Sequence, residues 1–310
     1  FRYTSGLYHP SCLGENLNIL IPATSANLGP GFDALGLSLK LFNSVKIEPS
    51  KFSSVSINGE GSDSVNLKRN NIFLSIFNEI FLELTGKNEN FRVVFENNIP
   101  FSRGLGSSSA VIVGAIASAY EMAGFKASKS VVLNKAIIYE THPDNISPAV
   151  HGGFISAIVK NGNVYANKIS LSDEIKAVVV IPNKPMSTSS SRQILPKNYT
   201  MKECVNNLSH AAFLTSCFYE KKYDLLKVAS KDLMHEERRM HALEELFEVR
   251  KVAYENGALM STLSGSGSSF LNIAYKDDAK NLQDILKSKF SDFRVEVFSF
   301  DNDGYEITQS

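Results

Sequence analysis

One segment of the chain reads Pro100, Phe101, Ser102, Arg103, Gly104, Leu105, Gly106, Ser107, Ser108, Ser109 and Ala110. It runs directly into residues 110–123, which are rich in Ala, Val and Ile and end at Gly124, a pattern that predicts a helix. Glycines let a ligand approach the backbone closely, and the free amides at a helix start favour a phosphate. Serine hydroxyls there are suitable Mg²⁺ ligands. The segment therefore predicts an anion-binding loop, although a tight turn with a serine N-cap has the same pattern. It is not a Walker A loop, because no Lys-Ser or Lys-Thr follows its second glycine.

Strands and helices alternate on both sides of this loop. Strands are expected at residues 18–21, 37–47, 92–96, 152–159, 176–181 and 294–300, with a strand-like segment at 261–274. Helices are expected at residues 71–84, 131–140, 201–218, 223–235, 243–256 and 279–290, the second of them ended by His142 and Pro143. The chain is therefore expected to mix α and β elements.

The chain has room for two domains, since 310 residues allow roughly 150 for each. We expect a boundary near residues 160–175, which gives domains at 18–165 and 166–310. Residues 1–17 lack both periodicity and a secretion signal. They are interpreted as an expression leader, with a native mobile arm as the alternative.

The composition is that of an ordinary globular chain, with 43% hydrophobic and 21% charged residues. Lys plus Arg and Asp plus Glu both number 32, so no overall charge attracts nucleic acid or an anionic membrane. The apolar runs are shorter than the ~18 residues of a membrane span. Cys12, Cys204 and Cys217 form no paired framework, which favours a reducing, cytoplasmic location.

Three further segments carry functional chemistry. Residues 22–36 read PATSANLGPGFDALG, residues 263–269 read LSGSGSS, and residues 140–145 read ETHPDN. Residues 29–34 match GxGxxA by letter, but a dinucleotide fingerprint would leave its strand at once and open a helix, which these residues are not expected to do. Each segment also has a simpler interpretation, as a turn or as a solvated helix end.

In this order and spacing, the four segments resemble the GHMP small-molecule kinases, from about residue 18 onward. The resemblance rests on PxxxGLGSSSA at residues 100–110 and on SGSG at residues 264–267. Residues 22–36 and the His142-Pro143-Asp144-Asn145 box, followed by Gly152 and Gly153, resemble the homoserine kinase branch. The resemblance implies an α+β fold with an N-terminal domain like ribosomal protein S5 domain 2 and a ferredoxin-like C-terminal domain.

The resemblance also implies a reaction and a set of roles. The γ-phosphoryl group of MgATP would pass to the side-chain hydroxyl of L-homoserine, a step of threonine synthesis, with residues 100–110 around the phosphates and Asn71 near adenine. Ser108 and Glu140 match the Mg²⁺ ligands. The residues that match homoserine contacts are Asn27, Asp33, His142, Asn145, Arg192 and Arg239. Arg239 is preferred to Arg238 because the family's arginine follows a histidine by four residues, and His235 has that position.

The resemblance implies catalysis without a dedicated base. Asn145 would orient the substrate hydroxyl, Asp33 would help to orient the substrate, and Asp144 is the rival base. The chain departs from the family pattern at Ser268-Ser269, where Pro-Thr is usual, and at Thr141, where Gly is usual. Neither change removes a required donor.

Other functions are less well supported by the residues. A GHMP kinase acting on mevalonate or a related alcohol is the nearest rival, and a non-catalytic ATP-binding regulator is a second. A zinc site and a serine hydrolase are disfavoured, because paired ligand spacing and a GxSxG elbow are both absent from the sequence. Nucleic-acid and membrane partners are not expected, and a homodimer is considered possible.

Overall fold

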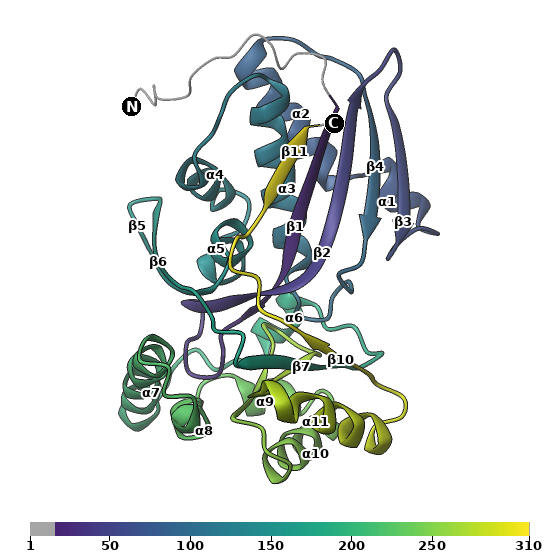
Figure 1. Ribbon diagram of the computed structural model, residues 1–310. Helices are drawn as coiled ribbons and strands as arrows, with labels where there is room; N and C mark the ends of the chain where they lie inside the picture. The colour runs from purple at the N-terminus through teal and green to yellow at the C-terminus, as the bar shows by residue number, and fades with distance from the viewer. Residues whose placement is uncertain (1–15, 310) are drawn as a thin grey trace.

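The computed structural model describes residues 16–309 as an α+β chain built on two sheets (Figure 1). The first sheet has seven strands, with the path β11-β1-β2-β4-β3 and with β5 placed against β2 and β6. Its strands are β1 (Leu17–Ala26), β2 (Leu35–Pro49), β3 (Ser54–Gly59), β4 (Phe91–Asn97), β5 (Phe154–Lys160), β6 (Asn163–Ile169) and β11 (Glu306–Gln309). The prediction of a leader or arm at residues 1–17 falls almost entirely outside the described residues.

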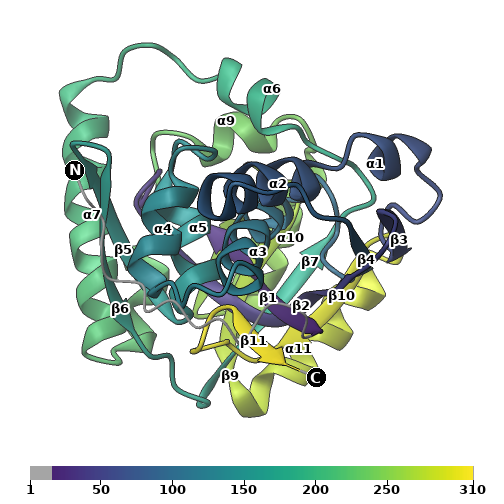
Figure 2. The same cartoon turned by 90° about the horizontal axis from the view of Figure 1, so that it is seen from above.

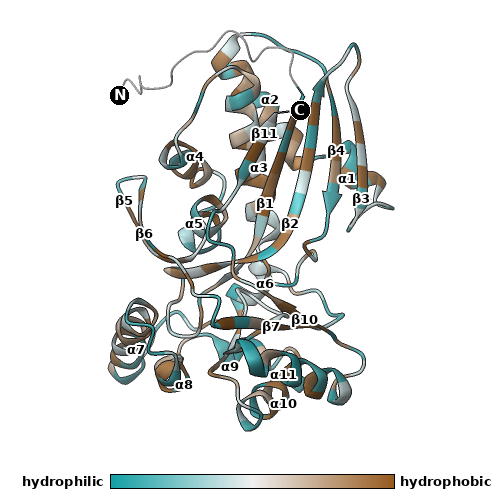
Figure 3. Ribbon diagram, in the orientation of Figure 1, coloured by the Kyte–Doolittle hydropathy of each residue, from teal (hydrophilic) through white to brown (hydrophobic). Residues whose placement is uncertain are grey.

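Helices α2 and α3 form the core of this first half together with β1. The five helices of this half are α1 (Val65–Arg69), α2 (Ile72–Thr85), α3 (Ser107–Met122), α4 (Lys129–Ala136) and α5 (Pro143–His151). Helix α2 begins where the Asn71 side chain accepts a hydrogen bond from the Leu74 amide at 3.1 Å, which satisfies a free helix-end donor. Its buried phenylalanines at 73, 77 and 81 meet Phe91 and Phe95 of β4 edge to face. Hydrophobic residues also lie along β1 and α3, which are largely brown in Figure 3.

The second sheet has four strands in the order β10-β7-β9-β8. They are β7 (Ile175–Ile181), β8 (Met260–Leu263), β9 (Phe270–Tyr275) and β10 (Arg294–Phe298). The helical elements of this half are α6 (Thr188–Gln193), α7 (Met201–Tyr219), η2 (Tyr223–Leu225), α8 (Leu226–Ala229), α9 (Glu236–Met240), α10 (Glu245–Glu255) and α11 (Lys276–Lys289). None of the helices in residues 16–309 is long and apolar enough to cross a membrane.

The two halves exchange segments. The expected boundary after residue 165 falls inside β6, which pairs with β5 as a hairpin of the first sheet. The hairpin lies beside α7 of the second half, and Phe154 stacks on Phe218 with 4.4 Å between ring centroids (Figure 2). Strand β11 returns from the second half to pair with β1. The first sheet is therefore completed by residues from both ends of the chain.

Three expectations differ from the structure. The helix predicted at residues 223–235 stops at Ala229, because Asp232 accepts the backbone N–H groups of Met234, His235 and Glu236 and so starts α9 instead. Pro143 was expected at a helix end, but it stands at the start of α5, where its missing N–H costs nothing. The strand-like segment 261–274 is a hairpin, β8 and β9, with the SGSG residues in its turn.

Candidate active site

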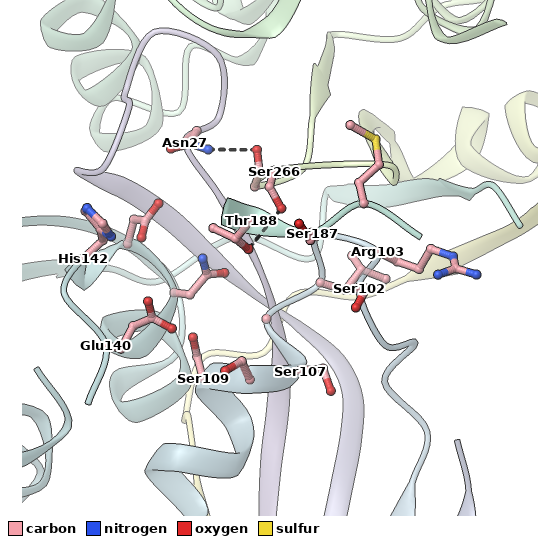
Figure 4. A pocket seen from close by; sticks show the side chains of 18 of the residues that line it. Asn27, Ser102, Arg103, Ser107, Ser109, Glu140, His142, Ser187, Thr188 and Ser266 are labelled. Atoms are coloured by element: carbon pink, nitrogen blue, oxygen red, sulfur yellow. Dashed lines mark hydrogen bonds between the residues drawn. The ribbon is translucent and has the colours of Figure 1, made fainter. Parts of the chain in front are cut away.

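A cavity of about 260 Å³ lies where the two halves of the chain meet (Figure 4). Its walls come from the β1–β2 turn, the loop before α3, the start of α5, helices α6 and α9, and the β8–β9 turn. The lining residues are Asn27, Asp33, Pro100, Ser102–Ser109, Glu140, His142, Asp144, Asn145, Met186, Ser187, Thr188, Arg192, Arg239, Gly265 and Ser266.

One wall of this cavity is the start of α3. Gly106 caps the helix in the left-handed region, with φ 70°, and as a glycine it has no side chain to bond to the first amides of the helix. Gly104 lies against the SGSG turn, where a Cβ atom would collide with the carbonyl oxygen of Ser264. The Ser264 hydroxyl donates to the Gly104 carbonyl at 2.6 Å. Two glycine loops from opposite halves thus hold each other, and the α3 amides stay free for an anion.

The side chain of Arg103 holds the same loop in place. Its guanidinium donates to the carbonyls of Pro182 at 2.8 Å and Phe101 at 2.9 Å, and in Figure 4 it extends away from the serines of the loop. Its role in the structure is therefore to tie the loop to the segment after β7.

A second cavity of about 320 Å³ adjoins the first and shares Ser102, Ser107 and Ser108 with it. Most of its other lining residues are apolar, and they come from β3, β4, α1, α2 and α3. They are Ile57, Leu67, Ile72, Phe73, Phe95, Phe101 and Val111, together with Asn71 and Asn97. A flat apolar group could occupy this cavity while a chain of anionic groups reaches the α3 start.

Acidic side chains cover the wall beside α3. Burial raises the pKa of Glu140, and a hydrogen bond with Ser109 partly offsets this effect. Asp144 is buried at the start of α5, where burial and the charges of Asp33 and Glu140 raise its pKa to about 7. Next to it, the Asn145 side-chain oxygen accepts a hydrogen bond from the Thr24 hydroxyl at 2.8 Å.

An ion pair also lines this cavity. Arg192 from α6 donates two hydrogen bonds to Asp33, at 2.7 and 3.0 Å. His142 Nε2 lies 3.6 Å from the same carboxylate, and burial lowers the pKa of this imidazole. The Asn27 side-chain oxygen accepts the Asp33 amide at 3.0 Å while its nitrogen donates to Gly265 at 2.9 Å. These contacts fix Asp33 between the two halves of the chain.

Arg239 is a second, almost fully buried arginine, with 1% of its surface exposed. It donates to His235 Nδ1 and to the Gly265 carbonyl, both at 3.2 Å. No carboxylate within residues 16–309 lies within ion-pair distance of it. Burial and the charge of Arg192 lower the pKa of Arg239 to about 10. The Phe32 ring lies 5.0 Å from the Arg192 guanidinium carbon and 5.2 Å from that of Arg239, so it contacts both cations.

Known proteins resemble this chain over nearly its whole length. A family model described as the GHMP kinases N terminal domain matches residues 71–153, and one described as GHMP kinases C terminal matches residues 214–292. The homoserine kinase of Campylobacter concisus is 95% identical over 294 residues, covering 95% of this chain and 100% of that protein. The chain belongs to the homoserine kinase family of GHMP kinases.

Other homoserine kinases match over nearly the same span. That of Campylobacter hominis is 64% identical over 93% of this chain and 98% of its own length. A crystal structure of homoserine kinase from Cytophaga hutchinsonii superimposes with a TM-score of 0.85 at 22% identity, covering 99% of both chains, which shows the shared fold. The α+β GHMP kinase fold expected from the sequence is thus confirmed.

The structure of this homoserine kinase family member brings the predicted site residues together, with three exceptions. Phe101 and Asn71 line the second cavity and not the first, and Ala110 lines neither because it is buried in α3. The sequence analysis missed Met186, Ser187 and Thr188, and it gave no individual role to Phe32 and Ser266, which lie in the segments at residues 22–36 and 264–267. The only local signal for Phe32 was its position next to Asp33.

The residues at the α3 start fit a magnesium ion. The Ser108 hydroxyl and the Glu140 carboxylate are oxygen donors on the wall of the first cavity, and Ser109 lies beside Glu140. Within residues 16–309, no group of three or more His, Cys, Asp or Glu side chains could hold a metal ion. This small donor set suits Mg²⁺, which is commonly held by one or two carboxylates and substrate phosphates.

Proposed function

We propose that this chain transfers the γ-phosphoryl group of MgATP to the side-chain hydroxyl of L-homoserine and forms O-phospho-L-homoserine. The proposal rests on one observation: the start of helix α3 and a pair of arginines, Arg192 and Arg239, line the same cavity. The first is suited to phosphates and the second to a carboxylate. The homoserine kinases that match the chain support the choice of substrate.

ATP would occupy both cavities. Its phosphates would accept hydrogen bonds from the α3 amides, and its adenine would lie among the apolar residues of the second cavity near Asn71. Ser108 and Glu140 would hold Mg²⁺, which would neutralise charge developing on the phosphoryl oxygens.

Homoserine would lie beside the charged side chains of the first cavity. Arg192 and Arg239 would bind its carboxylate, and Asp33, Asn27 and His142 would surround its ammonium group. Asn145, anchored by Thr24, would orient the hydroxyl toward the γ-phosphorus. We assign the larger part of catalysis to this positioning and not to a base, since phosphoryl transfer depends mainly on alignment and charge stabilisation.

Coupled measurement of ADP release tests the proposal. MgATP is offered with homoserine, mevalonate or serine, and we expect turnover with homoserine. Glu140→Ala is expected to lower kcat by about 100- to 1,000-fold because the metal site loses its carboxylate. Turnover with mevalonate alone would contradict the assigned substrate. Tight ATP binding without turnover on any alcohol would favour a regulator.

The cytoplasmic location that the sequence favours stays a prediction, and so does the homodimer that was considered possible. Fractionation of the cells that make the chain tests the first, and static light scattering of the purified chain tests the second.

A further inference from the structure

The Asp33–Arg192 ion pair occupies the wall where an amino acid substrate would have to bind. Its two hydrogen bonds join a carboxylate to a guanidinium, and both side chains stay accessible from the cavity, at 27% and 37% exposure. An α-amino acid carries the same two charges on groups attached to one carbon atom. An incoming ammonium would need Asp33, and an incoming carboxylate would need Arg192. In the structure these two groups are paired with each other.

The two arginines of the cavity, Arg192 and Arg239, differ in their partners. Arg239 is buried without a carboxylate partner among the described residues, whereas Arg192 already has one. A carboxylate entering the cavity meets one free arginine and one that Asp33 holds. It gains the Nη1–Nη2 face of Arg192, which both hydrogen bonds to Asp33 use, only if Asp33 releases that face.

We propose that the substrate binds by ion-pair exchange: its ammonium takes Asp33, its carboxylate takes Arg192, and the internal pair opens. This inference rests on the proposed function, because it takes the substrate to be an amino acid. One internal ion pair is replaced by two pairs with the ligand. The Phe32 ring, 5.0 Å from the Arg192 guanidinium carbon, holds that cation near the cavity when Asp33 leaves it.

The exchange selects ligands that carry both charges. To bind both arginines, a hydroxy acid such as 4-hydroxybutyrate would have to take Arg192 and leave the Asp33 carboxylate without that cation. An amino alcohol such as 3-aminopropan-1-ol would take Asp33 and leave Arg192 without an anion. Leaving Asp33 or Arg192 as an unpaired, partly buried charge reduces the affinity for such a ligand. A ligand with a single charge therefore leaves the Asp33–Arg192 pair closed.

The binding test uses Asp33→Asn with a non-hydrolysable MgATP analogue present. Removing the Asp33 charge frees Arg192, so we expect 4-hydroxybutyrate to bind about ten-fold more tightly than to the wild type, a change of one decade in Kd. Homoserine is expected to bind far more weakly to the same variant. Misfolding cannot produce a gain in affinity. Unchanged or weaker binding of 4-hydroxybutyrate, in a variant that still binds the MgATP analogue as the wild type does, would overturn the proposal.

The mirror variant is Arg192→Gln, for which 3-aminopropan-1-ol is expected to bind about ten-fold more tightly. His142→Gln is the matched control, because it leaves the ion pair in place and should increase affinity for neither ligand. A crystal structure with homoserine and the ATP analogue is the direct measurement. We expect Arg192 and Asp33 beyond ion-pair distance there, and a pair that stays closed around bound homoserine would overturn the exchange.

Wild-type turnover separates the two claims. If the wild type phosphorylates homoserine and neither variant gains affinity, the exchange fails while the proposed function stands. If the wild type does not phosphorylate homoserine, the proposed function fails.

Discussion

The two walls of the cavity are built by different means. The α3 wall consists of backbone amides, two glycines and serine hydroxyls from one continuous segment, supported by the SGSG turn. The other wall consists of charged side chains, Asp33, His142, Arg192 and Arg239, that the fold gathers from distant parts of the chain.

This difference sets what each wall tolerates. The α3 wall depends on close backbone approach, so a single added carbon disrupts it and pH hardly affects it. The charged wall depends on balanced burial of ionisable groups, so it responds to pH and to the loss of a charge or a ring. The four changes below test this contrast.

Gly104→Ala should have the largest effect and should act on the α3 wall. The added Cβ meets the backbone oxygen of Ser264, which cannot move aside, and φ is already 73°. We expect kcat/KM for ATP to fall by about 100-fold as the loop shifts by a fraction of an ångström. Steady-state kinetics with varied ATP measures the change.

Gly86→Ala is the matched control, because this glycine has φ 69° but open space around its Cβ position at the end of α2. It should cost about 1 kcal/mol of stability and leave kcat/KM for ATP unchanged. Equal losses in both variants would show that backbone strain, and not close contact with Ser264, explains the effect.

Lowering the pH should reduce the stability of the folded chain through His235. Burial lowers the pKa of this histidine to about 4, from a reference value of 6.5. Between these values the unfolded chain binds a proton that the folded chain does not, so stability falls as the pH falls. We expect His235 to account for a loss of about 2 kcal/mol in unfolding free energy between pH 7 and pH 5.

Urea unfolding at both pH values measures this loss. In His235→Gln the loss should shrink by that amount, whereas in His241→Gln, which removes an exposed histidine nearby, it should not. An identical pH dependence in all three proteins would exclude His235 as the cause.

Phe32→Leu should separate the two walls in kinetics. Loss of the ring removes its contacts with Arg192 and Arg239, so KM for homoserine should rise about ten-fold. KM for ATP should not change. Phe52→Leu, at an aromatic residue that is 81% exposed, is the control. A comparable rise in KM for ATP would mean that the ring supports both walls.

Asp144→Asn should have the smallest effect. A positioning mechanism without a base predicts that kcat falls only a few-fold, about 1 kcal/mol in the barrier. If Asp144 were the base, kcat would fall steeply below its pKa of about 7, where its carboxyl is protonated. A loss of turnover as complete as in Glu140→Ala would refute the assignment.

The contrast between the walls also explains how much of the site the sequence predicts. The loop at residues 100–110 is predictable on its own, because glycine, serine and an apolar helix are adjacent in the chain. Arg192 and Arg239 were assigned by resemblance alone. Phe32 was given no individual role because its contacts with both arginines exist only after the two halves meet.

The fold shows the same limit. Helix α2 was predicted to within one residue at each end, because its apolar spacing and its Asn71 cap are local signals. Helix α9 was not, because Asp232 competes for backbone amides that the apolar pattern assigned to a continuous helix. No local pattern in the sequence predicts that β6 belongs to the first sheet or that β11 returns to pair with β1.

The pairing of β1 with β11 has a consequence for synthesis on the ribosome. Strand β1 emerges before the other described strands, but its neighbour β11 is translated only after all the elements between them. Until then the edge of β1 that pairs with β11 presents unpaired amides and carbonyls, which are a template for pairing with other chains. A growing chain of this architecture therefore carries an open strand edge until β11 has been made.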